Sequence, residues 1–142
     1  MKTHTRHAFA SAVTISALVL LINVPGSFAQ SIQLRADVPF DFYISGKLMP
    51  AGSYTVRAVN AAAIRVSDAN GNATVVGTTA SFNDKLQKPR LIFHRYGNVN
   101  FLSELYWENY GTGRALQKSA RELEASNDLK SQTIQLATSG KR

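Results

Sequence analysis

Apolar and polar residues alternate along the chain from about residue 38 onward. This period of two is that of a β-strand with one buried face, and it runs over residues 38–44 and again over 53–59. Pro39 has no N–H group to donate, so we expect the first of these strands to lie at a sheet edge or to begin near this point. The apolar residues that stand in phase are Val38, Phe40, Phe42 and Ile44 in the first segment and Tyr54, Val56 and Ala58 in the second.

A hairpin is predicted around Asp68-Ala69-Asn70-Gly71, because Asn and Gly both tolerate the positive φ of a tight turn. A loop of two residues and a loop of four residues place the same side chains on each face of the hairpin. We therefore expect one face to carry Ile64, Val66, Ala73, Val75 and Gly77 and the other to carry Arg65, Ser67, Asn72 and Thr74.

A second hairpin is predicted over residues 90–107, with Gly97-Asn98 as its turn. A two-residue loop pairs Tyr96 with Val99 and His94 with Phe101. Both faces then hold large apolar groups, which is typical of a hairpin covered on both sides. We expect the main core on the face with Trp107, the largest apolar side chain. That face comprises Ile92, His94, Tyr96, Val99, Phe101, Leu105 and Trp107, and the opposite one Leu91, Phe93, Arg95, Asn100, Leu102 and Glu104.

The pattern changes near Ser119, where Ser119-Ala120-Arg121-Glu122 has the spacing of a capping box. In such a box Ser119 accepts from the Glu122 amide and the Glu122 carboxylate reaches back, so we expect a short helix to about Ser126. The polar tail, residues 129–142, is either frayed or adds one strand at 133–136. Strands and turns with one terminal helix predict an all-β fold over residues 30–128, a small antiparallel β-sandwich or barrel.

The first 29 residues have the order of an export signal. Basic Lys2 and Arg6 precede an apolar run, a Pro-Gly breaker follows, and Ser27-Phe28-Ala29 presents small residues to a cut after Ala29. A membrane anchor needs about 20 apolar residues without such a breaker. We therefore expect signal peptide 1–29 to be removed and the protein to be periplasmic or secreted, without a stable membrane span.

Composition excludes several kinds of chemistry. The 142 residues contain no cysteine and three histidines, and removal of the signal leaves only His94, which excludes disulfides, thiolate sites and multi-histidine metal centres. We expect neither a metal nor a cofactor. The net charge of +7 falls to +5 when Lys2 and Arg6 are removed. In an exported protein this charge favours an acidic polysaccharide, an envelope component or a partner protein over nucleic acid.

Several motifs of the predicted mature chain resemble a family of short, uncharacterised exported proteins of soil bacteria, notably acidobacteria. The motifs are Val38-Pro39-Phe40-Asp41-Phe42, Pro50-Ala51-Gly52-Ser53-Tyr54-Thr55-Val56, Arg95-Tyr96-Gly97, and Gly113-Arg114 followed by Gln117-Lys118-Ser119 and Glu122. The resemblance brings no assigned activity or site residues. Met49 and Ala115-Leu116-Gln117 depart from the usual pattern and concern turn geometry only.

Catalytic arrangements find little support. His94 is the one available general base, but on the expected register it points into an apolar face, where a structural role bonded to a carbonyl or to Ser103 is favoured. Glu104 and Glu108 share a strand face at roughly 13 Å, too far apart for a glycosidase pair. Asp68, Asn70 and Asp84 lack the spacing of a calcium loop, and turn chemistry accounts for Asp68 and Asn70.

The densest basic group, with one aromatic neighbour, is the candidate binding site. It comprises Lys85, Lys88, Arg90, Arg95 and Tyr96. We interpret the protein as an exported, non-catalytic binding or structural module for an acidic or carbohydrate-type surface partner. The alternatives are a small hydrolase or isomerase that uses His94, and an assembly subunit that pairs through an edge strand near Pro39 or in the C-terminal tail.

Overall fold

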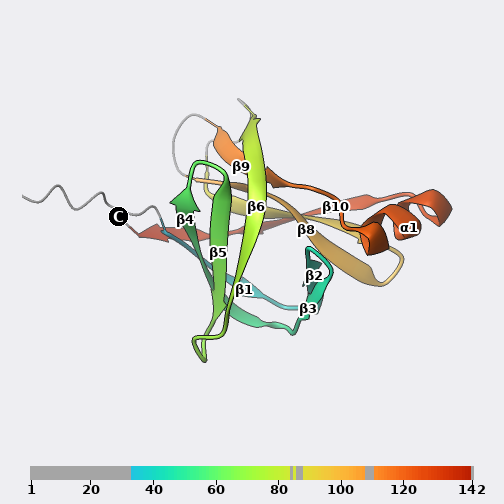
Figure 1. The fold of residues 1–142 in the computed structure, drawn as a ribbon, viewed down its shortest axis with the longest axis horizontal. Coiled ribbons are helices and arrows are strands. Elements are labelled where there is room, and N and C mark those ends of the chain that lie inside the picture. Colours follow the sequence, from blue (N-terminus) through green and yellow to red (C-terminus); the bar gives the residue numbers. More distant parts are fainter. Residues whose placement is uncertain (1–32, 84, 86–87, 108–110, 142) are drawn as a thin grey trace, which may run out of the picture.

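The computed structural model describes residues 33–83, 85, 88–107 and 111–141. This part of the chain is built from strands and one short helix, which confirms the all-β class (Figure 1). The predicted signal peptide lies outside the described residues. The strands are β1 (Gln33–Val38), β2 (Phe42–Ile44), β3 (Lys47–Met49), β4 (Gly52–Asn60), β5 (Ala63–Asp68), β6 (Ala73–Phe82), β7 (Arg90–Tyr96), β8 (Val99–Tyr106), β9 (Thr112–Leu116), β10 (Gln132–Ala137) and β11 (Ser139–Lys141), and the helix is α1 (Ala120–Asp128).

The strands form two sheets that share the long strand β6. Its first half pairs with β5 up to Gly77, and its second half pairs with β9 from Thr78 onward. The hydrogen-bonded path runs β10-β7-β8-β9-β6-β5-β4-β1-β11, with β2 beside β8 and β3 beside β2. In Figure 1, β4, β5 and β6 cross the direction of β8 and β10, as in two sheets packed at a steep angle around one core.

The C-terminal tail is part of this architecture. β10 pairs with β7 along its whole length, and β11 pairs with β1 at the opposite end of the path. Of the two expectations for the tail, the added strand is the one observed. The boundary expected after residue 128 is therefore wrong, because the tail supplies both terminal strands of the sheet.

For residues 38–44 the predicted buried face is confirmed, but the prediction of one continuous strand is wrong. Val38, Phe42 and Ile44 are buried and Phe40 packs against the same core. The segment divides into β1 and β2, which belong to different sheets, because Pro39 has no N–H to continue the ladder. The core draws on both sheets and contains Leu34, Ala36, Val38, Phe42, Ile44, Met49, Tyr54, Val56, Ile64, Val66, Val76, Leu91, Phe93, Leu102, Leu105 and Trp107.

The facing expected for the β5–β6 hairpin is wrong. Ser67 pairs with Ala73, so the loop has an odd number of residues, 68–72, and the parity changes. Asp68 holds this loop by accepting from the backbone N–H groups of Asn70 and Asn72, at 2.9 and 2.8 Å. Val76 is consequently the buried partner of Ile64, at 5% exposure, and Val75 is 61% exposed.

A β-bulge in β8 decides which face of the β7–β8 hairpin meets the core. The expected pairs Tyr96–Val99 and His94–Phe101 are present, but Phe93 pairs with Leu102 and Ile92 with Glu104, so Ser103 is the additional residue. The bulge reverses the phase of β8. The main core therefore takes Leu91, Phe93 and Leu102 together with Leu105 and Trp107, and the expectation that Ile92, Tyr96 and Phe101 join Trp107 there is wrong.

The opposite face of the hairpin is buried too, as expected for a hairpin covered on both sides. Ile92, Tyr96, Phe101 and Tyr106 are each at most 6% exposed. Tyr43 of β2 stacks on Phe101, with ring centroids 5.5 Å apart. We call this surface, with Ile92, His94, Tyr96, Phe101, Glu104 and Tyr106, the second face of the hairpin.

Gly113 is required by the packing of Tyr106. The two residues are cross-strand partners, and a Cβ at Gly113 would lie 2.6 Å from Cδ1 of Tyr106 and against the carbonyl oxygen of Leu105. We expect Gly113→Ala to lower the free energy of unfolding by about 1–3 kcal/mol, as overpacking does. The measurement is urea denaturation, with Gly52→Ala as the control, because the nearest atom to a Cβ at Gly52 is 4.0 Å away. Equal stabilities of the two variants would contradict the assignment.

Candidate functional site

The five residues of the expected basic site do not form one cluster. Lys85 and Lys88 are exposed and precede β7, and Arg90 begins that strand. Arg95 and Tyr96 lie at its other end, roughly 17 Å from Arg90 at 3.3 Å per residue. The structure therefore places the group at two ends of one strand.

Arg95 takes part in a hydrogen-bond network that joins three of the sequence motifs. Its Nε donates to Oδ1 of Asn100 at 2.7 Å, and Asn100 Nδ2 donates to the carbonyl of Asp41 at 3.0 Å. The Asp41 carboxylate in turn accepts from the backbone N–H of Ala51 at 2.8 Å. The Arg95 guanidinium also lies 5.5 Å from the centre of the Phe40 ring. These contacts give Arg95 a structural role.

Tyr96 lies where α1 folds back on the second face of the hairpin. Ser119 Oγ accepts from the Glu122 N–H at 3.2 Å, so that half of the expected capping box is confirmed. The Glu122 carboxylate extends to β7, where its Oε1 lies 3.4 Å from Nδ1 of His94. Glu122 is 4% exposed, so His94 has a buried carboxylate as its partner in place of the expected carbonyl or Ser103.

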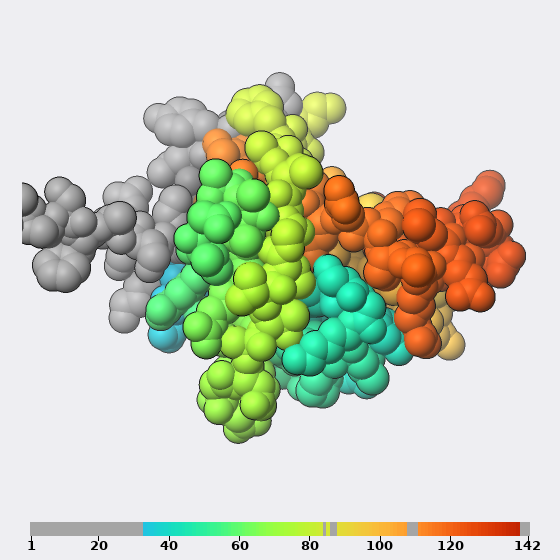
Figure 2. Space-filling model, in the orientation of Figure 1, coloured from blue at the N-terminus to red at the C-terminus, as the bar shows by residue number. Residues whose placement is uncertain are grey.

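Cation–π contacts hold the α1 segment against aromatic rings of β2 and β7 on this face. The Arg121 guanidinium lies 4.4 Å from the centre of the Tyr43 ring, and the Lys118 ammonium 5.7 Å from that of Tyr96, both within the range of a cation–π interaction. Tyr96 also packs edge-on against Phe101, with centroids 5.8 Å apart. In Figure 2, α1 and the residues around it (orange) form one end of the molecule, next to the β2–β3 hairpin (turquoise).

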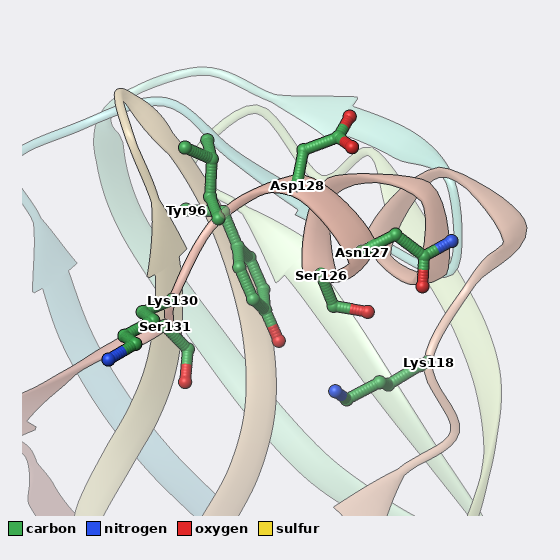
Figure 3. Close-up of a pocket in the computed structure, with 8 residues that line it drawn as sticks. Tyr96, Lys118, Ser126, Asn127, Asp128, Lys130 and Ser131 are labelled. Carbon is green, nitrogen blue, oxygen red and sulfur yellow. The ribbon is translucent and has the colours of Figure 1, made fainter.

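A hollow of about 440 Å³ lies between the end of α1 and β7. Its lining combines the Tyr96 ring with two lysines and several hydrogen-bonding groups. Figure 3 shows the Tyr96 ring reaching into it from β7, and the Asp128 carboxylate directed away from the Lys118 ammonium. The lining residues are Tyr96, Lys118, Ser126, Asn127, Asp128, Leu129, Lys130 and Ser131. We call this hollow the α1 hollow.

The lining of the α1 hollow has charged and hydrogen-bonding groups that can bind a ligand. Its cations suit an anionic group, and its hydroxyl and amide groups suit the hydroxyls of a sugar. Lys118 and Lys130 are the residues that the sequence interpretation missed. They flank the predicted helix on either side, and the capping-box spacing was the signal that placed the helix. Only the fold places both ends of that helix beside Tyr96.

A second polar cluster lies on the second face at Tyr106. Its hydroxyl donates to Oε2 of Glu104 at 2.6 Å and lies 2.8 Å from Oγ of Ser81. Burial, with Glu104 as hydrogen-bond acceptor, raises the pKa of Tyr106 above its usual value. The glycosidase pairing of Glu104 concerns Glu108, which lies outside the described residues, as does Asp84.

The described residues contain no group of three or more His, Asp or Glu side chains that could hold a metal ion. They also contain no helix with the length and hydrophobicity needed to cross a membrane. Comparison with known proteins returned no match: no protein-family model, no curated protein and no solved structure matches this chain. The physical arrangement of the residues is therefore the basis for any proposal of function.

The role of His94 can be tested by its effect on stability. His94→Ala leaves the buried Glu122 carboxylate without its histidine partner, which we expect to cost about 1–3 kcal/mol in the free energy of unfolding. Glu124→Ala, at an exposed position of the same helix, should change it by less than about 0.5 kcal/mol. Chemical denaturation measures both. An unchanged stability of His94→Ala would contradict a structural role.

The raised pKa of Tyr106 predicts a loss of stability in alkaline solution. Above about pH 10 the unfolded chain releases the phenolic proton while the folded protein retains it, so stability falls as pH rises. Tyr106→Phe should reduce the slope of stability against pH in this range, and Tyr43→Phe serves as the matched control. Burial raises the pKa of Tyr54 as well, so part of the slope should remain. Thermal unfolding between pH 8 and 11 measures it, and identical slopes for wild type and Tyr106→Phe would contradict the assignment.

Proposed function

We propose that this protein is an exported, non-catalytic binding module that holds an acidic, carbohydrate-type surface partner in the α1 hollow. The observation that carries the proposal is the Lys118 ammonium 5.7 Å from the centre of the Tyr96 ring, in a hollow whose lining also includes Lys130, Ser126 and Ser131. Cations, an aromatic edge and hydroxyls in one hollow suit a uronate or sulfated sugar.

The charge distribution supports an anionic partner. The lining of the α1 hollow contains two positive side chains, Lys118 and Lys130, and one negative side chain, Asp128. The Asp128 carboxylate is directed away from the Lys118 ammonium (Figure 3). The exposed Arg121 guanidinium lies on the same helix, over Tyr43. The net charge of +5 that remains after removal of Lys2 and Arg6 adds a long-range attraction for polyanions.

The proposal assigns His94 a structural role in place of the alternative of a hydrolase or isomerase. A general base must be within reach of a substrate. His94 is 25% exposed in its side chain, and its Nδ1 faces the buried carboxylate that helps hold α1 in place. We assign that pair to the stability of the α1 hollow.

The test is binding to an acidic polysaccharide such as polygalacturonate. The double variant Lys118→Gln, Lys130→Gln should weaken binding about tenfold or more, because two charge-assisted contacts are removed. The double variant Lys85→Gln, Lys88→Gln is the matched control, since it removes the same charge at the far end of β7 and should change affinity by less than about threefold. Isothermal titration calorimetry measures both.

Salt provides a second criterion for the same proposal. Raising the ionic strength should weaken the binding of an acidic polysaccharide, because salt screens charges at exposed sites. Equal losses for the two double variants would show that only overall charge matters and would reject the α1 hollow as the site. No binding of any acidic polysaccharide at low salt would reject the anionic partner.

A further inference from the structure

β10 is the longest described strand that pairs with one neighbour only. β3 and β11 also have a single neighbour, but each has three residues, whereas β10 has six. Its pairing with β7 leaves its second edge without a strand among the described residues. β11 begins two residues after β10 and pairs with β1, and among the described strands Gln132–Gln135 pair with β7 only.

The direction of the backbone groups of β10 follows from two observations. The Thr138 N–H donates to the Pro89 carbonyl at 3.1 Å, in continuation of the β10–β7 register. The N–H and C=O groups of successive residues point to opposite sides of a strand. Those of Ile134 and Leu136 therefore point toward β7, and those of Thr133 and Gln135 point outward. The pairing of β7 with β8 leads to the same assignment. The two-residue turn after Tyr96 directs the backbone N–H and C=O groups of Tyr96 and His94 toward β8, so those of Phe93 point toward Ile134 of β10.

The composition of this edge differs from that of the other edges. No charged residue occurs from Ser131 to Gly140, and the strand contains no proline. The other strands with a single neighbour, β3 and β11, carry Lys47 and Lys141. Natural sheets protect exposed edges with charge, proline, bulges or shortness, and β10 has none of these.

We propose that the outer edge of β10 pairs antiparallel with β10 of a second copy of this chain, around a two-fold axis at Thr133. In this register Thr133 faces Thr133 of the other copy, and each Ser131 faces Gln135, so the outward N–H and C=O groups meet in hydrogen-bonded pairs. Side chains of the same sheet face also meet, since Gln132 lies opposite Ile134, and Thr–Thr pairs are favourable across strands.

The absence of charge is what selects a second copy as the partner. Two copies of the exported chain, each with a net charge of +5 after removal of Lys2 and Arg6, repel each other, so pairing is favoured where no like charges meet. About the axis at Thr133 the nearest lysines, Lys130 of each copy, stand roughly 20 Å apart along the strands, well beyond the screening length in physiological salt. A partner of opposite charge would gain little from an uncharged edge.

Light scattering coupled to size-exclusion chromatography tests the proposal on the purified protein. We expect a dimer whose dissociation constant rises about tenfold or more in Thr133→Pro, because proline removes the N–H that points outward while the bonds to β7 remain. Thr133→Lys should have the same effect by placing two like charges at the axis. Thr133→Val retains the N–H and the strand preference and should leave the dimer intact.

Two readouts keep this test separate from the test of the α1 hollow. Salt should strengthen the dimer by screening the repulsion between copies, whereas it should weaken polysaccharide binding. A bismaleimide should join two copies of Thr133→Cys but not two copies of Asn70→Cys, which lies in the β5–β6 loop. The proposal is overturned by a monomer at all concentrations, by a dimer that Thr133→Lys does not weaken, or by equal cross-linking of both cysteine variants.

Discussion

The β7–β8 hairpin is apolar on both faces, and the rest of the structure provides cover for each. The bulge at Ser103 turns Leu105 and Trp107 onto the same face as Leu91 and Phe93, where the other sheet packs on them. On the second face, Tyr43 of the neighbouring strand β2 stacks on Phe101, and α1 packs over this end of the sheet through Arg121 and Glu122. Burial of apolar surface drives both arrangements, since each large side chain gains about 1.5–3 kcal/mol when it is removed from water.

The way in which the second face is covered also creates the binding surface. A helix with little apolar surface of its own cannot be held by hydrophobic contact alone, and α1 is docked through the Glu122–His94 contact and through Arg121 and Lys118 over tyrosine rings. These contacts leave cations and hydroxyl groups around Tyr96 at the rim of the docked helix. Structural and binding roles are thus divided among neighbouring residues of one short segment.

The position of β10 likewise contributes both to the packing of the core and to a surface that can bind. It completes the sheet beside β7 and supplies Ile134 and Leu136 to the core, while its outward backbone groups stay on the edge. The two ends of the strand path belong to consecutive segments of the tail, β10 and β11, so the tail links both sheets before the chain ends. This is the reason why a segment that reads as polar and weakly patterned is integral to the fold.

Local patterns determined much of this protein: the strand segments, the turn at Gly97-Asn98, the helix beginning after Ser119 and the pairing of His94 with Phe101 all follow from short-range periodicity and turn chemistry. The sheet face on which the side chains of two hairpins lie could not be predicted in this way. One additional residue in a loop or at a bulge moves every later side chain to the opposite face, and the alternation of apolar and polar residues does not reveal that residue. The split of the basic residues between the two ends of β7, the contact of Glu122 with His94 and the outward edge of β10 were decided by tertiary structure alone. They depend on which strands become neighbours, and that is set by the burial of both hairpin faces across segments far apart in the chain.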